Sequence, residues 1–216
     1  CQDMENENAQ VIVEKVQPKS SLSFTLPEPP PGGISFTASI ITISDRAFRN
    51  EYESGDLSGP ALQRAVLDCV AQLSQLDDRP VSCSIKSTHI VPDDKESIQN
   101  ILRSCAGGSL DDTLSGCDTT ACGVDLILTT GGTGCSPRDV TPEATMMVLD
   151  RECHGLMPFV MTACTAKQPL AALSRGTAGI LGTTMICNLP GNPRSIEEII
   201  PILLPVVIHA MSELKR

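Results

Sequence analysis

The apolar residues of the chain fall into two alternating patterns, short β-branched runs and longer segments with helical spacing. Four runs are typical of strands, and the first, third and fourth are apolar enough for buried strands. They are residues 37–43 (TASIITI), 81–91 (VSCSIKSTHIV), 124–130 (VDLILTT) and 183–189 (TTMICNL). A segment with a helix-start pattern follows each run, and residues 60–74 show the clearest apolar face. This alternation predicts a parallel, doubly wound α/β sheet.

Residue types that cap or begin helices predict where four helices start. The predicted starts are Pro60 in a first turn, Asp93 with Glu96 as a capping box, Thr141 as an N-cap before Pro142, and Ser195 with Glu198 as a second capping box.

The two patterns extend over most, but not all, of the 216 residues. Residues 1–34 are rich in Pro, Gly and Ser without periodicity, which predicts a disordered or linker lead-in to one domain at 35–216. Residues 106–123 are small and polar, which predicts a surface insertion. The apolar run that begins at Ile199 is short for a bilayer and contains two prolines, so we expect a buried helix and no membrane span.

The charge balance narrows the function classes. Sixteen basic and 26 acidic side chains give a net charge of −10, which disfavours binding to nucleic acids or anionic membranes. An anionic substrate would therefore need backbone amides or a metal ion. The ten cysteines form no C-x-x-C pair, so we expect mostly free thiols of a cytoplasmic protein, with a disulfide framework as the alternative.

Candidate chemistry gathers where the predicted strands end. Because the carboxyl ends of parallel strands share one rim of a sheet, four loops should converge there. They are Ser44-Asp45, Val91 to Asp94, Gly131 to Gly134 and Pro190 to Pro193.

The GGTG loop at 131–134 has two interpretations. Its glycines would let successive amides and the Thr133 hydroxyl reach phosphoryl oxygens, but a tight strand-to-helix turn needs glycines as well. It matches neither a Walker A loop nor a G-x-G-x-x-G fingerprint. Arg138, Asp139 and a helix start follow directly, which favours the phosphate-binding interpretation.

Two aspartates are candidate metal ligands. Asp93 and Asp139 lie in separate loops that should face one crevice, and paired carboxylates suit Mg²⁺, which also bridges to phosphates. The alternative is that each only caps a helix, and both roles can coexist. Ser174 and Arg175 could hold an anion or belong to plain surface, and the three histidines have no partners at catalytic spacing.

Taken together, the motifs resemble the molybdopterin adenylyltransferase family, which includes the N-terminal domain of gephyrin, over essentially everything from Phe36 onward. The motifs are ITISD (41–45), SGP (58–60), VPDD (91–94), DLILTTGGTGCSPRDVTPEAT (125–145), LSR (173–175), AGILG (178–182) and NLPGNP (188–193). The segment 106–123 is longer than the family's connection, and Cys135 stands at a variable position.

The resemblance implies a three-layer α/β sandwich, with a mostly parallel sheet and helices on both faces. It also implies a homotrimer that works with, or is fused to, a molybdenum-insertion domain. The implied reaction transfers AMP from MgATP to the terminal phosphate of molybdopterin, releasing pyrophosphate. The implied catalytic and Mg²⁺-binding residues are Asp93 and Asp139. The implied pterin-phosphate site comprises Gly131, Gly132, Thr133 and Gly134, with Ser44, Asp45, Arg138, Ser174 and Arg175 nearby. The implied adenylate site comprises Pro190, Gly191 and Asn192.

The implied chemistry is consistent with the residues present. A phosphate monoester is largely ionised at neutral pH because its second pKa is about 6, so a general base is not needed. One alternative is a non-catalytic pterin-binding or trimeric scaffold domain of a gephyrin-like protein, which would have no need for both aspartates. Another is the related molybdenum-insertion fold, against which the intact VPDD and PRD motifs argue.

Overall fold

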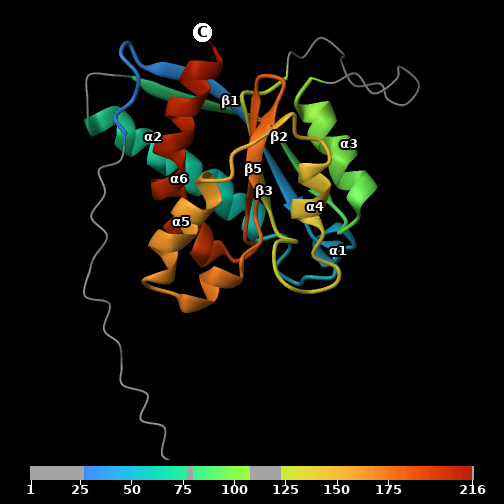
Figure 1. Cartoon of the computed structure of the whole chain (residues 1–216). Coiled ribbons are helices and arrows are strands. Elements are labelled where there is room, and N and C mark those ends of the chain that lie inside the picture. Colours follow the sequence, from blue (N-terminus) through green and yellow to red (C-terminus); the bar gives the residue numbers. More distant parts are fainter. Residues whose placement is uncertain (1–26, 77–79, 108–122, 216) are drawn as a thin grey trace, which may run out of the picture.

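The computed structural model describes residues 27–76, 80–107 and 123–215 (Figure 1). Most of the predicted lead-in at 1–34 and of the predicted insertion at 106–123 therefore lies outside the described residues. The remaining residues form one six-stranded sheet with helices on both faces.

The sheet is mostly parallel. Its strand order is β2 (Val81–Val91), β1 (Ile34–Ile43), β3 (Leu126–Thr130), β6 (Thr184–Leu189), β5 (Ala178–Leu181) and β4 (Arg151–Glu152). The first four are parallel to one another and coincide with the four predicted strands, whereas β5 and β4 pair antiparallel. The expected mostly parallel sheet is confirmed, and its antiparallel pairs lie at this edge. Only Gly182 and Thr183 connect β5 to β6, and so short a connection can only join antiparallel strands.

Helices form the outer two layers, as Figure 1 shows. On one face lie α2 (Ser58–Leu76), α5 (Leu156–Thr165) and α6 (Pro193–Leu214), and on the other lie α3 (Lys95–Cys105) and α4 (Thr141–Met146). Successive strand residues pack into different layers, as Ile40 joins the core under α2 and α6 while Ile41 joins the core under α3 and α4. The three-layer α/β sandwich is confirmed.

Helix α6 is a core helix. It is the one helix among the described residues whose length and apolar composition would suffice to cross a membrane. Half of its most apolar window is nevertheless buried inside the protein, and Ile200, Leu203 and Val207 are fully enclosed in the core next to α2. This burial matches the predicted buried terminal helix.

Three of the predicted helix starts are wrong by one to three residues. Asp94, not Asp93, caps α3 by accepting a hydrogen bond from the Ser97 amide at 2.8 Å. Asn192, not Ser195, caps α6. Thr141 lies inside α4, and its hydroxyl donates to the Gly131 carbonyl at 3.0 Å instead of capping the helix. The tertiary contacts of the loops, rather than local residue preference, decide which side chain is free to cap.

The order of the connections places a crevice between β1 and β3. From β1 the chain crosses one face through α2 to reach β2, and from β2 it crosses the other face through α3 to reach β3. The segment after β3 leads to α4 on the same face as α3, so the segments after β1 and β3 leave the sheet toward opposite faces. Such a switch point is where ligands bind in open α/β sheets.

Candidate functional site

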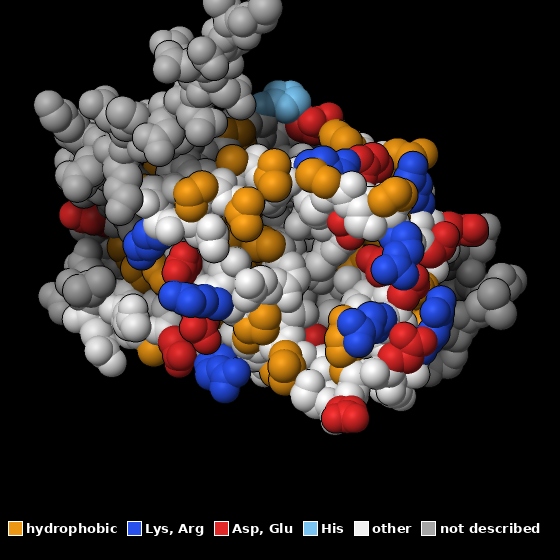
Figure 2. All heavy atoms as spheres, turned by 90° about the horizontal axis from the view of Figure 1, so that it is seen from below, with side chains coloured by type: hydrophobic (Ala, Val, Ile, Leu, Met, Phe, Trp, Pro, Cys, Tyr) orange, Lys and Arg blue, Asp and Glu red, His pale blue; other side chains and the backbone are white. Residues whose placement is uncertain are grey.

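The loops that follow the four parallel strands lie side by side at this rim, as predicted. The Ser44 amide donates to the Val91 carbonyl at 2.9 Å, and the Gly131 amide donates to the Leu189 carbonyl at 3.1 Å. Figure 2 views this end of the molecule and shows charged side chains on either side of a central strip of backbone and small side chains.

The glycine turn after β3 requires glycine at two positions. Gly131 and Gly132 have φ values of 101° and 62°, in the left-handed region. A Cβ on Gly131 would lie 2.2 Å from the Ile43 carbonyl oxygen, and one on Gly132 would lie 2.2 Å from Thr141 Oγ1. The turn is therefore tight for architectural reasons, and it also brings bare backbone to the centre of the crevice.

Asp45 and Asp93 hold each other through their backbones. The Asp45 amide donates to Asp93 Oδ2 at 2.9 Å, and the Asp93 amide donates to Asp45 Oδ1 at 3.2 Å. The pKa of Asp93 is raised, mainly by burial and further by the nearby Asp45 and Asp139 carboxylates, against the effects of the Asp45 amide and of Arg138. A carboxylate in such surroundings favours a bound cation.

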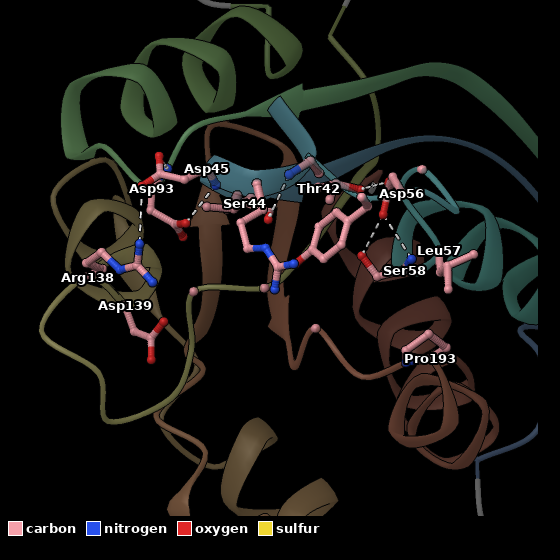
Figure 3. A pocket seen from close by; sticks show the side chains of 18 of the residues that line it. Thr42, Ser44, Asp45, Asp56, Leu57, Ser58, Asp93, Arg138, Asp139 and Pro193 are labelled. Atoms are coloured by element: carbon pink, nitrogen blue, oxygen red, sulfur yellow. Dashed lines mark hydrogen bonds and ion pairs between the residues drawn. The ribbon is translucent and has the colours of Figure 1, made fainter. Parts of the chain in front are cut away.

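Asp139 reaches the same space from the other side of the glycine turn. Its Oδ2 accepts a hydrogen bond from the Ser136 amide at 2.9 Å and would lie 2.8 Å from a Cβ on Gly134. The exposed Arg138 stands beside it, with Nη1 4.0 Å from Asp45 Oδ2. In Figure 3, Arg138 and Asp139 lie below Asp45 and Asp93 at the same end of the cavity.

A polar cavity of about 380 Å³ contains these carboxylates (Figure 3). Several of its lining residues were not singled out from the sequence, among them Arg46, Tyr52 and Asp56. Arg46 stacks on the Tyr52 ring, 4.3 Å from its centroid, and Asp56 accepts hydrogen bonds from the Thr42 hydroxyl at 2.6 Å and the Ser58 amide at 2.9 Å. An aspartate two residues before Ser-Gly-Pro is a common helix-start pattern, so the position of Asp56 could have identified it.

A second cavity of about 440 Å³ adjoins the first and has an apolar wall. Met161, Leu170 and Leu173 contribute to this wall from α5 and the 3₁₀ helix η1 (Pro169–Leu173). The two cavities share four lining residues, which are Gly131, Gly132, Asp139 and Gly191.

The two cavities divide the residues expected to bind the pterin phosphate. Those in the polar cavity are Ser44, Asp45 and Arg138, and those in the apolar-walled cavity are Thr133, Gly134 and Ser174. The latter cavity also contains Pro190, Gly191 and Asn192, which were expected to serve the adenylate. Arg175 is not among the described residues that line either cavity, and its guanidinium contacts the protein instead.

Within residues 27–76, 80–107 and 123–215, no group of three or more His, Cys, Asp or Glu side chains is arranged to hold a metal ion. A cation at Asp93 and Asp139 would therefore need further oxygen ligands from a substrate. This is how proteins usually hold Mg²⁺ beside phosphates.

The cysteines and histidines add no further candidates. All seven described cysteines are free thiols, in agreement with the prediction. Burial raises the pKa of Cys69 and Cys83 to about 11, and the nearby Asp125 carboxylate contributes at Cys83, so these thiols stay protonated. None of His89, His154 and His209 is among the described residues that line the cavities.

Residues 39–209 match the family model described as a probable molybdopterin binding domain, and the chain belongs to this family. The family predicted from the motifs is thus confirmed. The chain is 34% identical over 172 residues to the molybdopterin adenylyltransferase of Helicobacter pylori (strain J99), covering 80% of this chain and 84% of that protein.

Two further relatives have other names, and one of them is much longer than this chain. The chain is 35% identical over 182 residues to the molybdenum cofactor synthesis protein cinnamon of Drosophila melanogaster, covering 83% of this chain but only 26% of the fly protein. The fold is similar to the crystal structure of the molybdopterin biosynthesis enzyme MoaB from Thermus thermophilus. That match has a TM-score of 0.65 and 37% identity, and it covers 83% of this chain and 96% of the other.

Proposed function

We propose that the chain is a molybdopterin adenylyltransferase, which transfers AMP from ATP to the terminal phosphate of molybdopterin and releases pyrophosphate. One observation carries the proposal above all: two cavities meet at Gly131, Gly132, Asp139 and Gly191. Three of these four residues are glycines, so two ligands can approach each other across bare backbone. The name of the Helicobacter pylori relative supports the same reaction.

The reaction needs positioning and charge neutralisation more than proton transfer. An oxygen of the ionised pterin phosphate attacks the α-phosphorus of ATP, and the bond from that phosphorus to the β-phosphate oxygen breaks, so pyrophosphate leaves with its electron pair. The attacking oxygen carries no proton at neutral pH. The lack of a histidine among the described residues that line the cavities is therefore consistent with this chemistry.

We infer that Asp93 and Asp139 hold Mg²⁺ together with the phosphates. Asp93 and Asp139 both line the polar cavity. Gly132 and Gly134 leave the space that a side chain would take, since a Cβ there would lie 3.2 Å from Asp93 Oδ1 and 2.8 Å from Asp139 Oδ2. Mg²⁺ bound there would neutralise negative charge that develops on the phosphate oxygens.

The surrounding residues suit two phosphate-bearing ligands. The backbone of the turn from Gly131 to Gly134 offers amides, and Arg138 places a positive charge at the mouth of the polar cavity. The Ser174 hydroxyl is buried without a hydrogen-bond partner in the described part of the chain, so it is free to bond a ligand in the apolar-walled cavity. We propose that this cavity accepts a ring system and that the polar cavity accepts phosphates.

The assembly is part of the proposal. We propose a cytoplasmic homotrimer that works with, or is fused to, a molybdenum-insertion domain. The much greater length of the fly relative supports a multidomain parent. Light scattering of the purified chain tests the trimer, and a stable monomer would contradict it.

A pyrophosphate-release assay with MgATP and molybdopterin tests the function. The chain is expected to release pyrophosphate only when both substrates are present, and Asp93→Asn and Asp139→Asn are expected to abolish turnover while circular dichroism stays unchanged. If the chain binds molybdopterin with no ATP consumption, it is a pterin-binding module instead. Wild-type rates in both variants would contradict the metal assignment.

A further inference from the structure

The guanidinium of Arg175 is engaged by the protein on three sides. Its Nε donates to the Gly134 carbonyl at 2.7 Å, its Nη2 donates to the Asp139 carbonyl at 2.6 Å, and its Nη1 pairs with the Glu143 carboxylate. Its backbone amide also donates to the Thr133 carbonyl at 2.9 Å. A planar fork of this kind fixes several acceptors at once, which a lysine cannot do.

The acceptors belong to three consecutive parts of the site. Gly134 ends the glycine turn, Asp139 ends the next turn, and Glu143 lies in the first turn of α4. Arg175 reaches them from the segment between η1 and β5. One side chain therefore ties together the backbone on both sides of the Asp139 carboxylate.

The position of that carboxylate depends on this backbone. Asp139 Oδ2 lies close enough to Gly134 that a Cβ there would approach it to 2.8 Å, and it accepts a hydrogen bond from the Ser136 amide at 2.9 Å. A shift of the 134–139 segment would move Asp139 relative to Asp93, on the other side of the glycine turn. Even a small displacement of a catalytic carboxylate is enough to slow phosphoryl transfer, because the reaction depends on exact positioning.

Glu143 is suited to hold Arg175 and unsuited to bind an anionic substrate. Partial burial raises its pKa, but hydrogen bonds from its own amide and from Arg175 lower it overall, so the carboxylate is ionised at neutral pH. Its second oxygen, Oε2, is shielded from solvent. A substrate phosphate beside Arg175 would meet this negative charge.

We infer that Arg175 and Glu143 form a positioning pair, which fixes the Asp139 carboxylate at the junction of the two cavities and does not itself bind substrate phosphate. This inference rests on the proposed function for the role of Asp139 in holding Mg²⁺. It replaces the anion-binding role that the sequence suggested for Arg175.

Steady-state kinetics of Arg175→Gln, Glu143→Ala and the double variant test the pair, with Arg64→Gln as a control on the exposed surface of α2. We expect each single variant to lower kcat about tenfold and to raise the Mg²⁺ concentration for half-maximal rate, while the KM for molybdopterin stays within about twofold. The double variant should be no worse than Arg175→Gln, because the two residues act as a unit.

Hydrogen exchange of the backbone amides at 134–139 gives a readout that needs no turnover. Exchange should be faster in Arg175→Gln and Glu143→Ala than in the wild type or Arg64→Gln. If the wild type never consumes ATP, the proposed function fails, yet this exchange pattern still supports the pair. Unchanged exchange in both variants would overturn it.

Arg175→Lys separates positioning from anion binding and serves if Arg175→Gln does not fold. The lysine keeps the charge and loses the fork, so positioning predicts a low kcat and fast exchange, as in Arg175→Gln. Two results would overturn the inference. One is retained activity in Arg175→Lys. The other is a tenfold weaker affinity of Arg175→Gln for pyrophosphate with an unchanged Mg²⁺ dependence.

Discussion

The carboxylate of Asp93 accepts a hydrogen bond from the Asp45 amide at 2.9 Å, and the carboxylate of Asp45 accepts one from the Asp93 amide at 3.2 Å. These reciprocal bonds join the loops after β1 and β2 and place two negative charges at one rim. Asp93 does not cap α3, although its position in the sequence suggests that role, because the Asp94 side chain caps this helix. Asp93 is thereby held in the polar cavity at a cost in stability.

Asp93→Asn should stabilise the free protein at neutral pH. Because the pKa of Asp93 is raised in the folded state, chiefly by burial, the ionised carboxylate is held less favourably there than in the unfolded chain. The asparagine removes this charge and keeps an acceptor for the Asp45 amide. The gain should be complete above the raised pKa and should vanish as the pH falls through it toward the ordinary value.

Thermal unfolding at a series of pH values, in EDTA and without substrates, checks this expectation. Asp150→Asn is a suitable control, because Asp150 lies outside both cavities. An Asp93→Asn variant that is less stable than the wild type at neutral pH would show that the carboxylate is favourably placed without a cation.

Gly134→Ala should impair turnover and leave the fold intact. A Cβ at this position would lie 2.8 Å from Asp139 Oδ2, and the aspartate side chain can move away with little strain in the backbone. A displaced carboxylate should slow the reaction roughly 10–100-fold. Pyrophosphate release, compared with Gly155→Ala, whose Cβ would meet open space, measures the effect. Equal rates in the two variants would mean that the exact place of Asp139 is unimportant.

Asp56→Ala should destabilise the start of α2. The Asp56 carboxylate accepts hydrogen bonds from the Ser58 amide, the Gly59 amide and the Thr42 hydroxyl, so its loss removes a helix cap and a link to β1. We expect a loss of about 2 kcal/mol in the free energy of unfolding, measured with urea. Asp68→Ala, at an exposed position of the same helix, should change it by no more than about 0.5 kcal/mol. Similar losses in both variants would show that Asp56 does not act as a cap.

The parallel strands β1, β3 and β6 were predictable because they are largely buried on both faces and have nearly continuous apolar runs. Strand β2 lies at the edge of the sheet and is half exposed, and it was predictable because its sequence begins with alternating apolar and polar residues. Strands β4 and β5 were not, since β4 has two residues and β5 (AGIL) contains little β-branched sequence. Their pairing depends on the hairpin at Gly182 and on neighbours far along the chain. Helix ends were misplaced where a tertiary contact, such as that of Thr141 with Gly131, took a side chain that sequence preference assigns to a cap.

The loops of the site were predictable for a topological reason, because parallel strands must end at a common rim. What the sequence could not reveal is how side chains turn within that rim. Arg175 was expected to face an anion, but three of its N–H groups donate to Gly134, Asp139 and Glu143. Asp56 has a recognisable capping pattern, whereas the stacking of Arg46 on Tyr52 follows from the path of a loop that carries no periodic pattern.

The most direct measurement of the central claim follows the α-phosphate of ATP. The wild-type chain, incubated with molybdopterin, Mg²⁺ and ATP labelled at the α-phosphate, should form a labelled pterin product in equal amount to the pyrophosphate released. Asp139→Asn should bind molybdopterin and form no labelled product. Molybdopterin binding by the wild type with all label remaining in ATP, or transfer of label by Asp139→Asn at the wild-type rate, would contradict the account.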